Sequence, residues 1–286
     1  MLSVLLTVLF FAGFIPNSFA QEVPTPVNAK LVPDVISVRP GDSFRLGVLM
    51  EIDPGWHVYW KNPGDSGLPT KLEFEVPKAF DQRNINWPIP SSFKSPQGGA
   101  DFGYENSVLL WTNIEIPEDT KLNSSPRMQA EISWISCKEI CIPGKASIPY
   151  DLKLSKSTKQ SNSDLFSKWN KLLPIDMEHN DNPFEVEVSS KKSSNGIFEV
   201  EFELKFKSNQ NKIDTVEYYP NPGEGFLIQN LNYQMLPNKS AVRISFDVLS
   251  NESVNSSDAE LDGLVVYTDT NGNRLGLDAK FDLSKD

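Results

Sequence analysis

Two cysteines placed four positions apart are the residues of this sequence best suited to chemistry. Cys137 and Cys141 lie in the stretch WISCKEICIPG (134–144), and they are the only cysteines among the 286 residues. Such a pair can form a structural disulfide, bind a soft metal ion, or cycle between dithiol and disulfide. Each use makes a different demand on the elements that position the two sulfur atoms.

The spacing of the pair has a geometric consequence. A disulfide requires Cα atoms roughly 4.4–6.8 Å apart, whereas residues i and i+4 of one extended strand lie about 13 Å apart. A bridge between Cys137 and Cys141 therefore requires the chain to reverse between them. The flanking segments AEISWIS and KASIPYDLKL both alternate as strands do. We therefore predict a hairpin whose loop is Lys138, Glu139 and Ile140.

Energetics and ligand supply separate the three uses of the pair. A five-residue ring stabilises a fold by only about 2 kcal/mol, against roughly 4.7 kcal/mol for a hundred-residue loop, and a thiol readily opens a short exposed ring. Two thiolates suit Cu(I), whereas zinc needs four ligands, and the only histidines are His57 and His179. We therefore favour a redox dithiol, with no metal site and no cofactor. The alternatives are a non-catalytic binding module with a structural disulfide and a copper-binding protein of a copper-tolerance system.

Alternating apolar residues dominate the chain on both sides of a polar linker. We expect an all-β fold with two tandem β-sandwich domains, at residues 21–156 and 184–286. Between them, residues 157–183 form a linker that carries a short helix. The expected strands are 42–52, 71–76, 107–116, 128–136, 145–154, 184–190, 197–207, 241–249, 261–269 and 276–283.

The linker helix is predicted from the stretch SDLFSKWNKLLP. Its apolar residues recur at helical spacing, Ser163 is the expected N-cap, and Pro174 the expected stop. We expect this helix to pack against one of the domains. The apolar residues are Leu165, Phe166, Trp169, Leu172 and Leu173.

The N-terminus and the net charge bear on location and partners. Residues 1–20 are apolar and end in Ser18-Phe19-Ala20, which is typical of a signal peptide cleaved after Ala20. We therefore predict an exported protein that does not itself span the membrane, in a compartment where disulfides persist. The formal net charge of −11 argues against nucleic acid as a partner.

Four blocks of the first half resemble, in order and spacing, the periplasmic N-terminal domain of the thiol:disulfide interchange protein DsbD family. They are closest to its ScsB-like branch, in which a Cys-x3-Cys pair precedes proline. The second half, with VEYYP followed by LDGLVVYTD, resembles the second β domain of that branch. The four blocks are GWHVYWKNPGDSGLPTKLEF (55–74), INWPIP (85–90), GGADFGYENSVLL (98–110) and SWISCKEICIPGKASI (133–148).

The resemblance implies immunoglobulin-like domains and a periplasmic protein-disulfide reductase or thiol-disulfide relay. Carried over by position, Cys137 and Cys141 are the redox pair, although the sequence does not say which of them attacks. Phe102 lies on a cap loop that covers the disulfide until a partner docks, and Tyr104 flanks it. His57 and Tyr59 fall beside the cysteines.

The resemblance also implies the partners. Full-length family members continue into membrane helices and a thioredoxin-like domain, whereas this sequence stops at Asp286. We therefore expect a separate membrane electron donor, thioredoxin-like proteins as exchange partners, and exported disulfide proteins as clients.

Overall fold

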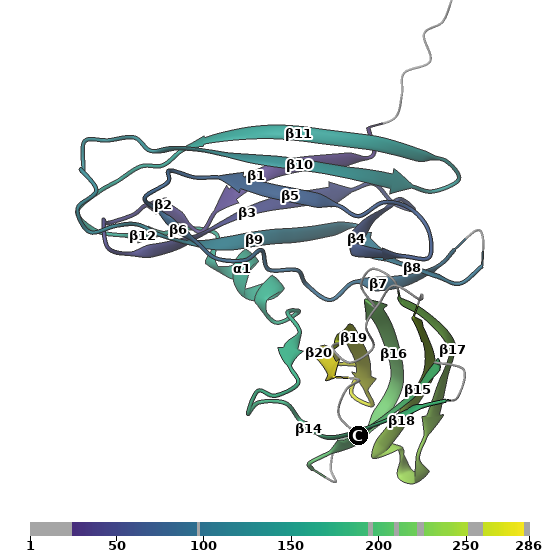
Figure 1. The fold of residues 1–286 in the computed structure, drawn as a ribbon. Coiled ribbons are helices and arrows are strands. Elements are labelled where there is room, and N and C mark those ends of the chain that lie inside the picture. The colour runs from purple at the N-terminus through teal and green to yellow at the C-terminus, as the bar shows by residue number, and fades with distance from the viewer. Residues whose placement is uncertain are drawn as a thin grey trace, which may run out of the picture.

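The computed structural model contains two β-sandwich domains joined by a segment with one short helix (Figure 1). Within the described part of the chain, no helix is both long enough and apolar enough to cross a membrane. The predicted signal peptide, residues 1–20, lies outside the described residues. The structure describes residues 25–95, 98–193, 197–208, 212–221, 226–250 and 260–282.

The first domain is built from two antiparallel sheets and a small two-stranded ladder. One sheet has the order β1 (Val27–Pro33), β3 (Ser43–Ile52), β9 (Ser107–Glu115) and β6 (Asp81–Gln82). The other has the order β11 (Cys141–Asp151), β10 (Arg127–Cys137), β4 (His57–Gly64), β8 (Ala100–Glu105) and β7 (Ser91–Lys94), and β5 (Lys71–Glu75) also pairs with β10. The ladder joins β2 (Val35–Ser37) to β12 (Lys159–Gln160).

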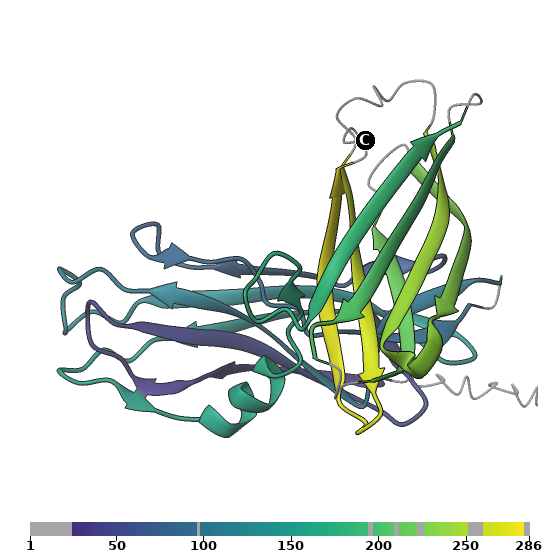
Figure 2. The ribbon, with the colours of Figure 1, turned by 90° about the horizontal axis from the view of Figure 1, so that it is seen from below.

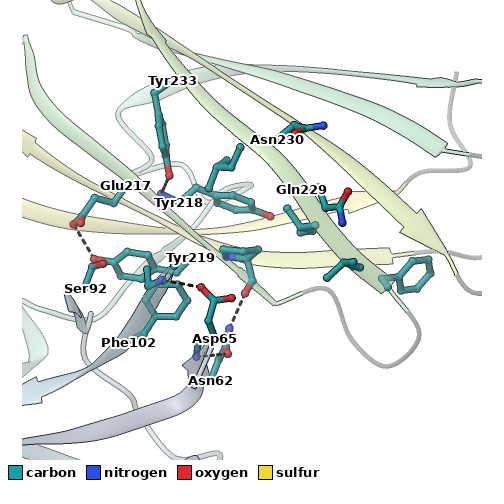
Figure 3. Close-up of a pocket in the computed structure, with 18 residues that line it drawn as sticks. Asn62, Asp65, Ser92, Phe102, Glu217, Tyr218, Tyr219, Gln229, Asn230 and Tyr233 are labelled. Carbon is teal, nitrogen blue, oxygen red and sulfur yellow. Dashed lines mark hydrogen bonds between the residues drawn. The ribbon is translucent and has the colours of Figure 1, made fainter. Parts of the chain in front are cut away.

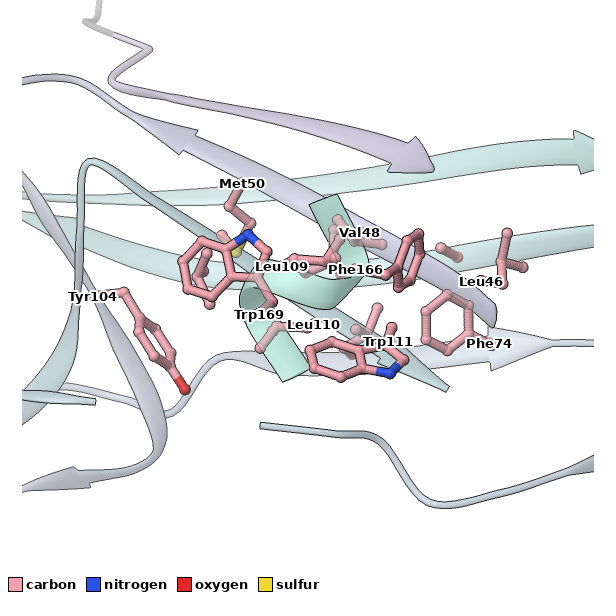
Figure 4. Packing of buried hydrophobic residues seen from close by; sticks show 14 of the residues in the cluster. Leu46, Val48, Met50, Phe74, Tyr104, Leu109, Leu110, Trp111, Phe166 and Trp169 are labelled. Carbon is pink, nitrogen blue, oxygen red and sulfur yellow. The ribbon is translucent and has the colours of Figure 1, made fainter. Parts of the chain in front are cut away.

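Alternation in the sequence explains which side chains these sheets bury. Successive side chains of a strand point to opposite faces, so Leu46, Val48 and Met50 of β3 all reach the core, where none is exposed to solvent. Figure 4 shows them together with Trp111 of β9, which is 1% exposed. The predicted strands of the first half thus form the core of one sandwich.

The helix α1 (Ser163–Asn170) packs on this first core. Phe166 and Trp169 are its buried residues, and the Phe166 ring meets Trp111 edge to face at 6.1 Å between centroids (Figure 4). The prediction of a helix here is confirmed. Its cap is one residue earlier than we expected, because Asn162, in a left-handed conformation, occupies the N-cap position and Ser163 is already helical.

The second domain is a sandwich of two four-stranded sheets. Strand β13 pairs in parallel with β20, so it belongs to this sandwich although its residues fall in the predicted linker. A 3-10 turn, η1 (Pro237–Lys239), precedes β18. One sheet has the order β13 (Ile175–Asp176), β20 (Arg274–Asp282), β19 (Glu260–Asp269) and β16 (Ile213–Asn221). The other has the order β14 (Phe184–Lys192), β15 (Ile197–Phe206), β18 (Ala241–Ser250) and β17 (Phe226–Met235). The predicted all-β fold with two sandwiches is confirmed.

The two domains touch where the β7–β8 hairpin of the first meets β16 of the second (Figures 1 and 2). The rings of Phe102 and Tyr219 stack with centroids 4.4 Å apart. The Asn62 side-chain amide donates a hydrogen bond of 2.6 Å to the carbonyl oxygen of Pro220. The hairpin therefore lies between the rest of its own sheet and the neighbouring domain.

Candidate active site

The two cysteines form a disulfide at the tip of the β10–β11 hairpin. The strands pair continuously from Arg127 opposite Asp151 to Cys137 opposite Cys141, whose Cα atoms are 4.1 Å apart. The Lys138 amide donates to the carbonyl of Ile140 at 3.0 Å and closes the loop. The predicted hairpin with a three-residue loop is therefore confirmed.

The two halves of the disulfide have different surroundings. Cys137 is 4% exposed, whereas Cys141 is exposed, as are the three loop residues beside it. The topology explains the difference, because Cys137 lies on an inner strand opposite His57 of β4, while Cys141 begins β11, which is the terminal strand of the sheet. A partner can therefore approach the pair from the side of Cys141.

The disulfide lies on the outer face of the sheet, away from the core of the first domain. Directly paired residues of neighbouring strands point to the same face. Val58 faces the core and is paired with Ser136 on one side and Tyr104 on the other. His57 and Cys137, which are paired one position further along, must then point outward. Cys137 is accordingly buried without belonging to the core cluster of the described residues.

Tyr59 covers Cys137 on this outer face. It follows His57 by two positions on β4, so both side chains point outward, yet Tyr59 is only 3% exposed. Its hydroxyl donates a hydrogen bond to the Cys137 Sγ atom at 3.5 Å. Burial raises the pKa of the Tyr59 phenol, so the hydroxyl keeps its proton at neutral pH and remains a donor.

A glycine makes room for the Tyr59 ring. Gly67 has φ +77°, and a Cβ atom placed there would lie 2.2 Å from the Tyr59 Cζ atom. Only a residue without a side chain can take this backbone conformation against the ring without strain. The segment 62–67 thus helps to enclose the site.

His57 is held between two rings. It stacks on Phe93 with centroids 4.7 Å apart and meets Tyr59 edge to face at 5.4 Å. Its Nε2 atom is buried and has no hydrogen-bond partner among the described residues. Burial lowers the pKa of His57 against the opposing effect of Asp101 and Glu105, so the imidazole is neutral at pH 7.

Hydrogen bonds fix the segment 62–67 to β8. The Asp65 carboxylate accepts the Ala100 amide at 2.7 Å. Asp101, which is 2% exposed, accepts both the amide and the hydroxyl of Ser66, at 2.8 and 2.6 Å. The segment that encloses Tyr59 therefore moves with the β7–β8 hairpin.

The structure does not bring Phe102 and Tyr104 to the disulfide, which differs from the expected cap. Phe102 lies within strand β8 rather than on a loop, and its ring stacks on Tyr219. The Tyr104 hydroxyl donates to the Pro88 carbonyl at 2.7 Å inside the core. Both side chains lie on the face of β8 opposite to Glu105, which is paired with His57. Side chains alternate between the two faces of a strand, so Phe102 and Tyr104 share one face of β8 and Glu105 lies on the other.

Sequence reasoning also missed Phe93, a further aromatic residue on the outer face. Phe93 of β7 is paired with Asp101 of β8, so it points to the same face as His57. It lies in a four-residue strand that follows Pro88 and Pro90, in the stretch PIPSSFKS, in which no clear alternation is visible. Alternation identifies long strands well and short ones poorly.

A cavity of about 530 Å³ lies between the domains, beside the face of the β7–β8 hairpin that carries Phe102 (Figure 3). Phe102 and Asp65 of the first domain line it, together with Glu217, Tyr219 and Tyr233 of the second. Neither cysteine lines it. The chemistry of the disulfide therefore belongs to the outer face of the sheet and not to this cavity.

Comparison with known proteins relates the first domain to a known family. Residues 26–149 match the family described as "Thiol:disulfide interchange protein DsbD, N-terminal", whereas no curated protein sequence matches the chain. The fold is similar to the crystal structure of the N-terminal periplasmic domain of ScsB from Proteus mirabilis. The TM-score is 0.61 at 18% identity, and the match covers 89% of this chain and 92% of that one. The first sandwich, with its disulfide hairpin, is thus a DsbD N-terminal-like domain of the thiol–disulfide exchange type.

Proposed function

We propose that the protein relays reducing equivalents to other exported proteins by thiol–disulfide exchange at Cys137 and Cys141. The observation that carries the proposal is the asymmetry of the disulfide, in which an exposed Cys141 is bonded to a buried Cys137 with a hydrogen-bond donor at its sulfur. Exchange needs one accessible sulfur to be attacked and one sulfur that leaves readily. The site offers both.

The oxidised protein first accepts electrons. A thiolate of a reduced, thioredoxin-like donor attacks the Cys141 Sγ atom, the Cys137–Cys141 bond breaks, and Cys137 leaves as a thiolate. The Tyr59 hydroxyl donates to that thiolate and lowers its energy. The second thiolate of the donor then attacks the donor sulfur of the mixed disulfide. The donor departs as a disulfide, and Cys141 is released with two electrons gained by the pair.

The reduced pair then passes its electrons on. The Cys141 thiolate attacks a disulfide of a client protein, and one client sulfur leaves as a thiolate. Cys137 next attacks Cys141 in the mixed disulfide, which releases the second client thiolate and restores the Cys137–Cys141 bond. Protons are exchanged with water, so the client gains two electrons and two protons in all.

The remaining predicted residues receive roles from their positions. We propose that Tyr59 acts as the hydrogen-bond donor to Cys137 and that His57 lines the same outer face. Phe102 and Tyr104 support β8 from its inner face. The signal-like residues 1–20 and the periplasmic origin of the similar ScsB domain support an exported, periplasmic location.

Trapping in the native compartment tests the proposal. The Cys137→Ala variant keeps the accessible sulfur and loses the resolving one, so it should accumulate mixed disulfides with thioredoxin-like proteins or clients. Cys141→Ala is the matched control and should trap far less, because its remaining sulfur is buried. If neither variant forms mixed disulfides, and the bond has a potential below about −300 mV as structural disulfides do, the relay proposal fails.

A further inference from the structure

We infer that Phe93 makes the exchange regiospecific, because it closes the Cys137 side of the disulfide, and that the second domain holds Phe93 in place. The inference rests on the proposed function and specifies which sulfur of the pair a partner can attack. It assigns to the second domain a part in the chemistry of the first.

Side chains of neighbouring strands enclose Cys137. Its neighbour across the ladder is His57, and the hydroxyl of Tyr59 contacts its sulfur. Phe93 covers the His57 ring from outside, with the two planes only 15° apart. Removal of the Phe93 ring would expose the imidazole and open a path toward Cys137, whereas Cys141 is exposed already.

Phe93 lies on the β7–β8 hairpin. Among the described strands, β7 is the last of its sheet and pairs only with β8. Phe93 is opposite Asp101, and Phe102 is opposite Ser92, so the two phenylalanines point to opposite faces of one hairpin. Phe93 points toward the disulfide side and Phe102 toward the second domain.

Residues of the second domain contact this hairpin. The Phe102 ring stacks on Tyr219 at 4.4 Å (Figure 3). The Arg274 guanidinium donates to the carbonyl oxygen of Pro90, the residue before β7, and to the Tyr219 hydroxyl at 3.2 Å. An edge hairpin with few strand neighbours opens locally at low cost. These contacts from the second domain therefore keep Phe93 over His57.

The test compares the reactivity of the two thiols. The full-length reduced protein is treated with iodoacetamide, and the alkylation rate of each cysteine is followed by mass spectrometry. In the unaltered protein Cys141 should react faster than Cys137. In Phe93→Ala the ratio of the two rates should fall roughly three- to tenfold, as the loss of one aromatic pair would allow.

Two control variants separate the ring from the hairpin. Phe93→Tyr keeps an aromatic ring over His57 and should retain the ratio. Lys94→Ala changes an exposed neighbour on the same strand and should leave the ratio unaltered. An unchanged ratio in Phe93→Ala would overturn the inference while leaving the relay intact. Absence of mixed disulfides in both cysteine variants, together with a potential below about −300 mV, would remove the relay and leave the inference about access standing.

The part of the second domain is tested with Tyr219→Ala. This variant should lower the ratio in the same direction and increase hydrogen exchange of the β7–β8 amides, whereas Tyr219→Phe should keep both near their original values. If Tyr219→Ala also lowers the unfolding temperature, Arg274→Ala serves as a second variant. It removes the contact to Pro90 by changing a more exposed side chain. Faster hydrogen exchange without a change in ratio, or no change in either, would contradict the role of the second domain.

Discussion

The two sandwiches of this protein share an architecture but use their aromatic residues differently. In the second domain, rings such as Phe202 and Phe246 fill the core, with 6.2 Å between their centroids. In the first domain, Tyr59, His57 and Phe93 gather on the outer face of a sheet, next to a disulfide. The comparison teaches that the chemistry lies in a few outward-facing residues and not in the sandwich itself.

A second difference is the supply of reactive side chains. Both cysteines lie in the first domain, and residues 184–286 contain neither cysteine nor histidine. The second domain contributes instead the surface that contacts β7 and β8, through Tyr219 and Arg274. One domain thus carries the reactive sulfurs, and the other contacts the hairpin beside them.

The largest expected effects come from the two cores, and they test whether the domains are separate. Trp111→Ala in the first domain and Phe202→Ala in the second each remove a ring from a side chain that is 1% exposed. Each should lower the free energy of unfolding by about 3–5 kcal/mol. Hydrogen exchange measured strand by strand should show the loss of protection mainly in the altered domain. Equal loss of protection in both domains would mean that the two sandwiches unfold as one cooperative unit.

The next effect concerns the glycine that makes room for Tyr59. Gly67→Ala should destabilise the first domain by about 1–2 kcal/mol from its left-handed backbone alone, and more because the new methyl group meets the Tyr59 ring. The matched control is Gly272→Ala in the second domain, where φ is +83° and, apart from its chain neighbours, no described residue places an atom within 4 Å of the added carbon. Chemical denaturation measures both. Equal losses would mean that the ring contact contributes nothing.

A smaller effect sharpens the chemistry of the first domain. Tyr59→Phe removes the hydroxyl that donates to the Cys137 sulfur, so the thiolate loses a hydrogen bond and the thiol pKa rises. We expect an increase of about one unit, since a hydrogen bond to a charged group is worth roughly 1.5 kcal/mol. Thiolate absorbance as a function of pH measures the change. A Cys137 pKa equal to that of the unaltered protein would remove Tyr59 from the mechanism.

The smallest effect is the pH dependence of stability. The pKa of His57 in the folded protein is lowered by burial, so below the ordinary value near 6.5 the unfolded chain binds more protons than the folded one. The free energy of unfolding should therefore fall as pH drops below about 6.5. His57→Gln should flatten this dependence, and His179→Gln, at an exposed site, should not. Unfolding midpoints measured between neutral and mildly acidic pH test this prediction. Parallel curves of midpoint against pH for all three proteins would contradict it.

The sequence predicted the parts of the site that depend on local pattern. Two alternating segments on either side of Lys138, Glu139 and Ile140 were enough to place the hairpin, because the chain must reverse to bring the sulfur atoms together. The positions of His57 and Tyr59 beside the cysteines followed from the resemblance to the DsbD family. The structure places both on the outer face with Cys137.

The sequence could not predict which phenylalanine of the β7–β8 hairpin lies on the side of the disulfide. Phe102 was the expected cap, yet it stacks on the second domain, while Phe93 reaches His57. A shift of one position along a strand moves a side chain to the opposite face, and that register depends on how strands β4, β7 and β8 pair. Those pairings join residues far apart in the chain, so no local pattern contains them.

By itself, the sequence determined the two β domains, the short helix between them and the cysteine hairpin, since each follows from periodicity and spacing within about a dozen neighbouring residues. Only the tertiary structure decided that Cys137 is enclosed while Cys141 is exposed, and that Tyr219 of the second domain meets the hairpin beside the site. Burial and contact between domains arise from pairings across long sequence separations, and these depend on the packing of the whole molecule.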